Sequence, residues 1–558
     1  MLILLPLAAA ALRGFSLPGW FLPPECVILA IPLRILYWEK GGGRWGDYAG
    51  GILHVLLYFS FLQQTAPFLP IPVALILGLW WLAERAIYFG VRPWIPQALA
   101  GASAVVAVDW FRGQWPMGGV PWGTLALGMG ERPLARDWGS VLGESGWIVL
   151  LALCGAALYS WFGPRRSRRE HLIELLPAPL LILVVALAVE PRAELRDAVR
   201  TLSIQGNLSI EEKHGRWGVR EVFGRQAAVT YAGLAEEPEA AWVIWPETMY
   251  PIPVTPPEGS ERADGFMIRP WPTREEKRST QSLRDANQKN ISTLIDGAAT
   301  GRRFVAGAHF YLGVPDKEDW REGEPREPET WSPRTSEFLV FGPDGRLEDH
   351  FSKTELVPFG ERLPFRGHFP GGEWFALEVL RSTGLYPRFA HSGREGPVEV
   401  GDWQLGGAIC WENVFEAPFR RQADAGAEAF VILSNENWYR LSIEMDQMVT
   451  ATRWRAAETG RPILRATNTG VTALFDRRGE LLGELPRGVR GWMGADLHRI
   501  DGDFRTPYLR WGWRLQPVLA WLALLGAIAG TLLRRQTQAS AGAKEGSGPS
   551  LDPSPGHR

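Results

Sequence analysis

The sequence predicts an α/β domain inserted between transmembrane α-helices. Its 558 residues exceed what one hydrophobic core ordinarily organises, so at least two structural units are expected. Apolar segments follow one another from residue 2 to residue 189 and return near 514–533, whereas strand and helix patterns alternate between them. We therefore expect a transmembrane domain over 1–190, a layered α/β domain over 191–510, a final transmembrane helix over 511–535 and a tail over 536–558.

The first 190 residues form a series of apolar segments separated by Pro, Gly or charged residues. Several are shorter than the roughly 20 residues that an isolated membrane helix needs, so their boundaries are soft. Buried helices of a soluble protein are the alternative, but so many in succession would need an implausibly large core. We expect about eight transmembrane helices, with seven or nine as alternatives, near 2–17, 25–38, 50–65, 71–88, 94–110, 146–163, 172–189 and 514–533.

Basic residues predict the orientation of these helices. With the N-terminus in the cytoplasm, the basic positions that flank the spans fall on the inner side, where Lys and Arg are enriched. They are Lys40 and Arg44, Arg85 and Arg92, the cluster at 165–169, and Arg534 and Arg535. This orientation places residues 191–510 on the outer side. The opening apolar segment lacks a basic n-region, so we expect it to be retained rather than cleaved.

The loop expected between the fifth and sixth spans, roughly 111–145, is rich in Trp, Gly and Pro and includes Trp115 and Trp122. Anchoring at the membrane interface is the ordinary explanation for such tryptophans. Lining a path for lipid is the alternative.

Apolar strands interleaved with helices predict an α/β layered domain between residues 191 and 510. Reactive side chains of such folds lie at strand ends, where short loops aim them. The expected strands are 201–206, 241–245, 303–312, 336–341, 346–352, 403–409, 429–434, 462–467 and 471–476, and the expected helices are 216–236, 281–297 and 443–459.

Three of these strand ends carry reactive residue types. Glu247 closes the second strand, Lys353 follows 346–352, and Cys410 closes 403–409. Cys26 and Cys154 lie in apolar runs, so Cys410 is the only thiol expected in the soluble part and has no disulfide partner there. Taken one by one, the ordinary interpretations are a small buried cysteine, a surface carboxylate and a solvated lysine. Together, a carboxylate, an ammonium and a thiol at strand ends can converge on one site.

The order of four motifs carries a resemblance to a known family. They are W-P-E at 245–247, K-x-x-L-V-P-F-G-E at 353–361, I-C-W-E at 409–412 and S-N-x-x-W at 434–438. In this order and flanked by apolar segments, they resemble the bacterial apolipoprotein N-acyltransferases of the nitrilase superfamily. The resemblance implies a nitrilase-like αββα sandwich, a catalytic triad of Glu247, Lys353 and Cys410, and supporting residues Glu361, Trp411, Glu412, Asn435 and Trp438. Later family elements match Arg453, Arg455, Glu458, Arg461, Pro462, Asn468, Thr469 and Gly470.

The chemistry suits these residue types. A thiol with a pKa of about 8.5 is mostly protonated at neutral pH, so a base and a nearby cation both help it to react. Glu247 would accept the Cys410 proton, and Lys353 would stabilise the oxyanion, together with a backbone N–H near Trp411. Glu361 would orient Lys353 or share the role of base.

The implied reaction is a ping-pong acyl transfer. Cys410 would take an acyl chain from a membrane phospholipid and pass it to the α-amine of a lipidated N-terminal cysteine on an apolipoprotein. The resemblance implies a multi-pass protein of the bacterial inner membrane, with its catalytic domain on the periplasmic side and no cofactor or metal. The net charge of −2 indicates no nucleic-acid partner. The alternatives are a membrane-bound amidase that hydrolyses a small amide and a membrane scaffold with an unreactive Cys410.

The chain departs from the family pattern in three places. Trp411 stands where Tyr is usual, and of the usual G-P-x-Q-H only Gln447 remains in 444–448, where Met448 replaces the histidine. Trp217 is a late match to a family tryptophan. These departures bear on substrate detail rather than on the type of reaction.

Four segments outside the motifs carry weaker predictions. The apolar stretch 363–380 would either guide acyl chains at the interface or pack into the core. The polar stretches 255–280 and 314–335 predict exposed loops. The chain after Arg535 is rich in small and polar residues and predicts a disordered cytoplasmic tail.

Overall fold

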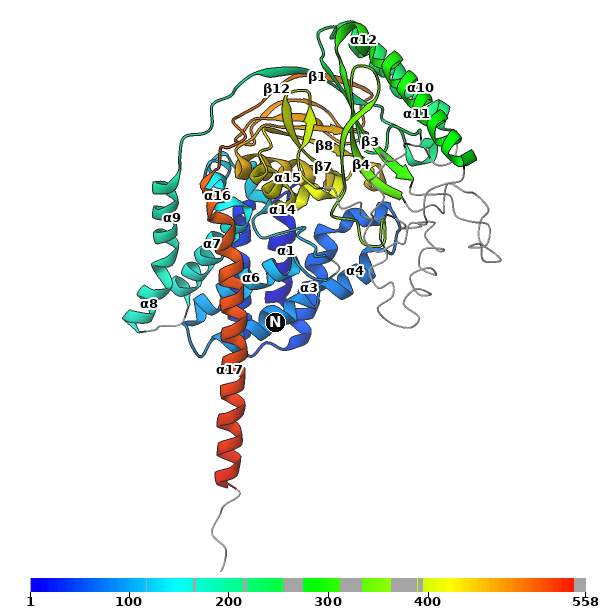
Figure 1. The fold of residues 1–558 in the computed structure, drawn as a ribbon. Helices are drawn as coiled ribbons and strands as arrows, with labels where there is room; N and C mark the ends of the chain where they lie inside the picture. Colours follow the sequence, from blue (N-terminus) through cyan, green and yellow to red (C-terminus); the bar gives the residue numbers. More distant parts are fainter. Residues whose placement is uncertain are drawn as a thin grey trace, which may run out of the picture.

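The chain folds into a helical bundle with an α/β domain on top of it, as Figure 1 shows. The computed structural model describes residues 2–116, 118–163, 167–213, 218–252, 254, 274–311, 334–362, 389 and 395–545. The segments 255–273, 312–333 and 363–388 lie outside these ranges. The predictions for the stretch 363–380, for Trp217 and for most of both polar stretches therefore concern residues that are not described.

The bundle is built from the N-terminal apolar segments. Its helices are α1 (Leu4–Phe15), η1 (Pro24–Leu29), α2 (Ala30–Glu39), α3 (Arg44–Tyr58), η2 (Ser60–Gln64), α4 (Pro70–Leu77), α5 (Trp80–Val91), α6 (Gln97–Arg112), η3 (Leu127–Glu131), α7 (Pro133–Phe162), α8 (Arg168–Leu175) and α9 (Pro177–Ala188). Helix α17 (Leu515–Glu545) returns to the bundle from the far end of the chain and packs against α5 and α6.

Every predicted span overlaps a helix of the bundle, but fewer helices are long enough to cross a membrane. By length and composition, four among the described residues qualify: Pro70–Val91, Pro133–Phe162, Arg168–Ala188 and Gly512–Gln538. The other helices of the bundle are shorter, because Pro and Gly interrupt the apolar segments, and each of them spans only part of the thickness of a bilayer. The number of about eight spans stays a prediction.

Two boundaries differ from those expected. Residues 133–145, expected in a loop, begin helix α7, since Pro133 occupies its first turn, where a missing N–H costs nothing. At Gly143, with φ 63°, α7 changes direction. Helix α17 runs to Glu545, so residues 536–545 are helical where we expected a disordered tail. Their Ala, Gln and Lys residues are good helix formers, and they continue a helix that is already nucleated.

A chain of buried ion pairs connects the helices of the bundle. Arg13 of α1 lies 2.9 Å from Glu84 of α5 and 3.5 Å from Asp109 of α6. Arg34 of α2 lies 3.2 Å from both Glu84 and Asp47 of α3. Charges inside an apolar bundle are tolerated when they are paired, and the loss of any one of these ion pairs would leave a buried charge uncompensated. The pairs therefore fix how α1, α2, α3, α5 and α6 pack.

The α/β domain contains two six-stranded sheets. The first has the order β12-β1-β2-β3-β4-β5 and the second β11-β10-β9-β8-β7-β6. Strands β1, β2 and β3 run parallel, as do β7, β8 and β9, while the outer strands pair antiparallel. The strands are β1 (Ala198–Gln205), β2 (Trp242–Trp245), β3 (Arg303–Tyr311), β4 (Arg334–Phe341), β5 (Leu347–Ser352), β6 (Val398–Val400), β7 (Trp403–Ile409), β8 (Ala429–Ser434), β9 (Ile463–Thr467), β10 (Thr472–Phe475), β11 (Leu481–Leu485) and β12 (Gly491–His498).

The two sheets pack face to face with helices outside, which confirms the predicted αββα sandwich. One core lies between the sheets and contains Ile244 and Phe338 from the first and Ile409 and Leu433 from the second. Helices α10 (Val219–Glu236) and α11 (Arg274–Ile295) cover the outer face of the first sheet. Helices α14 (Glu416–Asp424) and α15 (Ile443–Thr459) cover the second.

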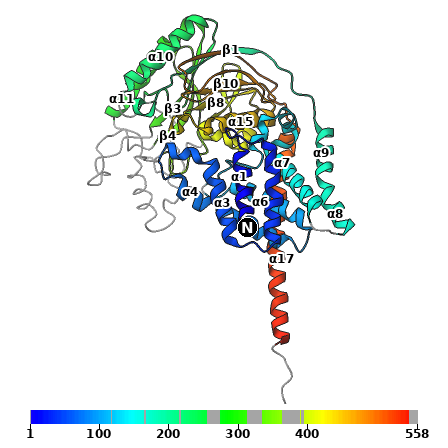
Figure 2. The ribbon, with the colours of Figure 1, turned by 180° about the vertical axis from the view of Figure 1, so that it is seen from behind.

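Helix α15 is enclosed on both sides. Ala456 faces the second sheet, whereas Met448, Ala451 and Trp454 belong to the core of the helical bundle. Figure 2 shows α15 between the sheets above and the bundle helices below. The second sheet therefore sits on the bundle through α15, and the strand ends near this helix face the bundle.

The expected strands and helices of the α/β domain are all present. The strand 403–409, the strand 429–434 and the helix 443–459 have the expected bounds. Strands β6, β11 and β12 and helix α14 were not expected. Strand β11 is half-exposed along its length, so it lacks the apolar run by which buried strands are recognised.

Candidate active site

Cys410 stands at the carboxyl end of β7, where the chain turns into the short helix η7 (Cys410–Val414). Its φ of 54° is a left-handed conformation, which costs a residue with a side chain about 1 kcal/mol or more. The side chain is half-buried and packs against both the core between the sheets and the core of the bundle. The thiol therefore lies at the junction of the α/β domain and the helical bundle.

Glu412 ties the Cys410 turn to the loop after β5. Its Oε1 accepts hydrogen bonds from the backbone N–H of Thr354 at 2.6 Å, the Thr354 hydroxyl at 2.8 Å and the backbone N–H of Glu355 at 3.1 Å. Its Oε2 accepts a bond from the N–H of Ile409 at 2.8 Å. Because Lys353 precedes Thr354, these charge-assisted bonds hold the cysteine and lysine turns together.

Lys353 lies between two carboxylates. Its Nζ is 2.8 Å from Oε1 of Glu361 and 3.3 Å from Oε1 of Glu247, and the residue is 1% exposed. Burial by itself would lower the pKa of Lys353, but the charges of Glu361 and Glu247 outweigh burial and hold the pKa well above its usual value. These charges therefore favour the positively charged form of Lys353. Glu361 is fixed in turn by a 2.9 Å hydrogen bond from the N–H of Val357.

Glu247 follows β2 and is also fixed on both sides. While Oε1 faces Lys353, Oε2 accepts a 3.0 Å hydrogen bond from the backbone N–H of Asn435, after β8. Gly307 of β3 leaves room for this strand end, since a Cβ at this position would come within 2.5 Å of the Glu247 Cα. Glu247 therefore bridges the ends of strands from both sheets.

The charges around the thiol keep it protonated at rest. Burial raises the pKa of Cys410, the negative charge of Glu247 raises it further, and the Lys353 ammonium lowers it. Burial also raises the pKa of Glu361, an effect that Lys353 opposes. Since only a thiolate is a strong nucleophile, the thiol needs a base at the moment of attack.

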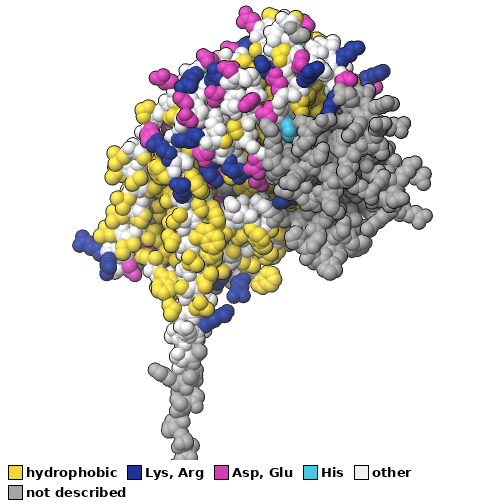
Figure 3. Space-filling view, viewed as in Figure 1, with side chains coloured by type: hydrophobic (Ala, Val, Ile, Leu, Met, Phe, Trp, Pro, Cys, Tyr) yellow, Lys and Arg dark blue, Asp and Glu magenta, His cyan; other side chains and the backbone are white. Residues whose placement is uncertain are grey.

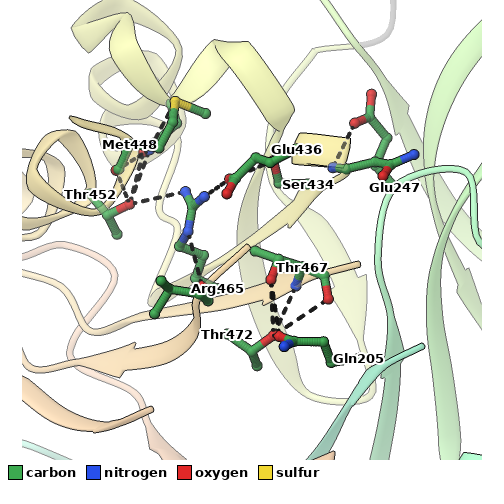
Figure 4. A network of polar contacts seen from close by, with 12 residues as sticks. Gln205, Glu247, Ser434, Glu436, Met448, Thr452, Arg465, Thr467 and Thr472 are labelled. Atoms are coloured by element: carbon green, nitrogen blue, oxygen red, sulfur yellow. Dashed lines mark hydrogen bonds and ion pairs between the residues drawn. The ribbon is translucent and has the colours of Figure 1, made fainter. Parts of the chain in front are cut away.

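Arg465 is a buried cation near the site that the sequence patterns did not single out. It lies on β9 and forms an ion pair with Glu436, and both side chains are fully buried (Figure 4). Glu436 accepts a 3.0 Å hydrogen bond from the Ser434 hydroxyl, so the pair braces the loop whose Asn435 N–H bonds Glu247. A charged residue in the apolar run ILRAT was the available signal.

Three tryptophan residues connect this site to the bundle, two through their side chains and one through its backbone. The Trp122 ring, from the loop before η3, stacks on Trp411, with centroids 6.1 Å apart and planes at 28°. Trp122 Nε1 donates a hydrogen bond to Oε1 of Gln447 on α15. The carbonyl of Trp438 accepts a 3.1 Å hydrogen bond from the Thr65 hydroxyl, next to η2. Trp411 and Trp438, which the sequence predicts to be supporting residues, therefore both contact the helical bundle.

The residues of the later motif connect the elements around the site. Arg455 of α15 lies 2.7 Å from Glu144 of α7 and 3.0 Å from Glu458. Asn468 donates a 3.0 Å hydrogen bond to the side chain of Asn435. Arg461 donates hydrogen bonds to backbone carbonyls, including those of Thr459 and Gly502. Arg453 donates a hydrogen bond to the carbonyl of Gly479. Within the described ranges, no cluster of three or more His, Cys, Asp or Glu could hold a metal ion.

Comparison with known protein families assigns the α/β domain to a class of proteins. Residues 224–501 match the family model described as carbon-nitrogen hydrolase. This range holds Glu247, Lys353 and Cys410, so the α/β domain is a carbon-nitrogen hydrolase domain of the nitrilase superfamily. Residues 9–157 match a second model, the apolipoprotein N-acyltransferase N-terminal domain. The chain belongs to the bacterial apolipoprotein N-acyltransferases, which are membrane-associated acyltransferases.

Relatives match along most of the chain. An apolipoprotein N-acyltransferase of Azotobacter vinelandii is 27% identical, with 96% of each chain covered. Those of Pseudomonas aeruginosa and Vibrio parahaemolyticus are 26% identical, with 96% and 90% of each chain covered.

Solved structures are more distant. A nitrilase-superfamily protein of Saccharomyces cerevisiae is 15% identical with a TM-score of 0.35, covering 55% of this chain and 93% of its own. An amidase of Nesterenkonia is 15% identical with a TM-score of 0.34, covering 56% of this chain and 94% of its own.

Proposed function

We propose that this protein moves an acyl chain from a membrane phospholipid, through a thioester on Cys410, to the N-terminal α-amine of a lipidated cysteine on apolipoproteins. One observation carries the proposal. A half-buried thiol at the edge of the membrane bundle shares its surroundings with a buried ammonium held between two carboxylates. Family membership supports this transfer reaction over the hydrolysis of a small amide.

In the first half-reaction, Glu247 takes the proton of the Cys410 thiol while the sulfur attacks the ester carbonyl carbon of the phospholipid. Lys353 stabilises the negative charge that develops on the carbonyl oxygen, because its pKa keeps it charged. The carbon–oxygen bond of the ester then breaks. Glu247 returns the proton to the leaving oxygen, which gives a lysophospholipid and an acylated Cys410.

In the second half-reaction, the neutral α-amine of the acceptor attacks the thioester carbon. Glu247 accepts one proton from the attacking nitrogen, the carbon–sulfur bond breaks, and the same proton returns to the sulfur. The amide forms and the free thiol is restored. Apolar side chains next to Cys410 limit the access of water, so the thioester persists until an amine arrives.

Glu361 and Glu412 position the reacting groups rather than exchange protons with substrate. Glu361 makes the shorter contact with Lys353 and is held by Val357, so it fixes the ammonium. This leaves the carboxylate of Glu247, at 3.3 Å from the ammonium, as the base. Glu412 joins the turns of Cys410 and Lys353.

We further propose that the bundle crosses the inner membrane several times, with the α/β domain on its outer side. On the face seen in Figure 3, apolar side chains cover the bundle helices, and Lys and Arg side chains lie along the edge of this apolar surface farthest from the sheets. Arg168, Arg169, Arg534 and Arg535 belong to the elements at this edge. Basic residues concentrate on the cytoplasmic side of membrane proteins, so the sheets face outward.

Intact mass of the purified protein after incubation with phospholipid tests the proposal. The parent protein should gain the mass of one acyl group. Cys410→Ala should gain none, whereas Cys154→Ala, a matched loss of a thiol inside the bundle, should behave as the parent. An adduct on Cys410→Ala, or none on the parent, would contradict the mechanism.

The base and the cation are tested in the same assay. Glu247→Gln and Lys353→Ala should each slow adduct formation by about 100-fold or more, the usual contribution of such groups. Thermal unfolding in detergent should show that both variants are folded. Acylation near the parental rate in either variant would remove that residue from the triad.

A further inference from the structure

Three buried polar atoms beside the proposed nucleophile have no hydrogen-bond partner in the described structure. They are Oε2 of Glu444, Nε2 of Gln447 and Nε1 of Trp411. Burying a polar atom without a partner costs about 1–3 kcal/mol, and proteins keep such atoms mostly where a ligand or water completes them. Three such atoms on adjoining elements are candidates to bind one polar ligand.

The three side chains lie on adjoining elements. Glu444 and Gln447 are one turn apart on α15 and therefore share a helix face. The Oε1 atom of Gln447 already accepts the indole N–H of Trp122, which leaves its amide N–H groups as donors. Trp122 stacks on Trp411, the residue after Cys410. This chain of contacts leads from the helix face to the thiol.

Glu444 is the residue that defines the chemistry of this site. It is 1% exposed, and no ion pair among the described residues involves it. Its neighbour Asp446 pairs with Arg487, so this cation is already engaged by another carboxylate. Lys353 is already held by two carboxylates. A buried carboxylate without a counter-ion is costly, so a cation that reaches it from outside would bind strongly.

Electrostatics place this carboxyl group near the reaction. Burial raises the pKa of both Cys410 and Tyr439, and Glu444, when it is ionised, is among the groups that raise each pKa further. Burial, and then the charge of Asp446, hold the pKa of Glu444 itself well above the ordinary value. The carboxyl group is therefore poised to ionise when a positive charge arrives.

We propose that Glu444 binds the primary ammonium group of a substrate next to Cys410, and that Gln447 and Trp411 donate hydrogen bonds to an oxygen of the same substrate. This inference rests on the proposed function and adds a binding residue to it. Two substrates carry such an ammonium. One is the acceptor, whose α-amine is followed by a carbonyl, and the other is a phospholipid with an aminoethyl headgroup, whose amine is followed by a phosphate.

Equilibrium binding to the Cys410→Ala protein tests the inference without turnover. The acceptor probe is a diacylglyceryl-cysteinyl peptide, compared with the same peptide acetylated on its α-amine. The donor probes are phosphatidylethanolamine and phosphatidylglycerol in detergent micelles. Each is measured with Glu444 intact, with Glu444→Gln, and with Asp446→Asn, which removes the paired carboxylate two residues away on the same helix.

We expect one of the two amine probes to bind at least tenfold tighter than its partner without an amine. This preference should disappear in Glu444→Gln and persist in Asp446→Asn. In a further variant, Glu444→Asp, which keeps the carboxylate on a shorter side chain, it should return in part. Loss of the preference for the free peptide amine identifies the acceptor as the ligand, and loss of the preference for phosphatidylethanolamine identifies the donor.

Two results would overturn the inference. One is the absence of a preference for the amine-bearing probe, or a preference that Glu444→Gln leaves unchanged for both pairs of probes. The other is an equal loss in Asp446→Asn, which would show a general effect of charge at the start of α15. Failure of the proposed function is separate, because it appears as a missing acyl adduct on the parent protein.

Discussion

The indole ring of Trp122, from the membrane domain, stacks on Trp411, the residue that follows the proposed nucleophile. Buried charge holds the loop of Trp122 in place. Arg112 at the end of α6 donates hydrogen bonds to the carbonyls of Val120 and Trp122, and it pairs with Asp109 at 3.1 Å. Asp109 also accepts the N–H of Leu125 at 3.0 Å. The helical bundle therefore supplies part of the surroundings of the proposed nucleophile.

Replacement of Trp122 should slow the enzyme without unfolding it. Trp122→Ala removes the stacking on Trp411 and the hydrogen bond to Gln447, so we expect acyl-enzyme formation to fall by about tenfold, as an aromatic contact and one hydrogen bond together contribute about 1.5 kcal/mol. Trp122→Phe keeps a ring and should lose less. Time-resolved intact mass measures both. A rate for Trp122→Ala equal to that of the parent would contradict this role.

Replacement of Glu412 should loosen the turns of Cys410 and Lys353 together. Glu412→Gln replaces one acceptor oxygen with an NH₂ group that faces backbone N–H donors, so at least one hydrogen bond is lost, at a cost of about 2 kcal/mol. We expect a lower unfolding temperature in detergent and at least tenfold slower acylation. Glu348→Gln, which removes a half-exposed carboxylate paired with Arg303, is the control and should change neither. Parental stability of Glu412→Gln would refute the bridging role.

The rate at which Cys410 is alkylated should separate the two roles of Glu247, which are to act as the base and to raise the pKa of the thiol through its negative charge. Because burial and the charge of Glu247 raise the pKa of Cys410, its alkylation by iodoacetamide should be slow at pH 8 and keep rising beyond pH 9. Glu247→Gln removes a negative charge, lowers the thiol pKa and should speed alkylation by about threefold to tenfold, although it stops acylation. Lys353→Met should slow alkylation. Peptide mapping distinguishes Cys410 from Cys26 and Cys154. Slower alkylation in Glu247→Gln would mean that the charge of Glu247 does not raise the pKa of the thiol, and it would contradict this electrostatic explanation.

Arg465 should stabilise the fold through its buried ion pair. Arg465→Met leaves Glu436 buried and uncompensated, which we expect to cost about 3–5 kcal/mol. The double variant Arg465→Met with Glu436→Gln should recover a large part of this loss. Denaturation midpoints in detergent provide the comparison. If the single and double variants unfolded at the same midpoint as the parent, the pair would have no structural role.

Much of the α/β domain could be predicted from local patterns. Strands β7 and β8 are continuous apolar runs, and α15 is a long segment that ends at Gly460, which adopts a φ of 69°. Reactive residue types directly after such strands were visible without any structure. Half-exposed strands such as β11 lacked this signal. The short helices of the bundle gave apolar segments, but local composition does not decide whether such a segment crosses the membrane.

The sequence by itself determined the two-part architecture, the layered α/β class and the three strand-end residues, because apolar periodicity and turn positions are local properties of the chain. The αββα sandwich was implied by the resemblance of four motifs to a known family. Tertiary structure decided which groups meet. The 2.8 Å approach of Glu361 to Lys353, the Arg465–Glu436 pair, the stacking of Trp122 on Trp411 and the burial of Glu444 join positions from different strands, helices and loops. Such contacts depend on how sheets and helices pack in three dimensions, and no local pattern encodes that packing.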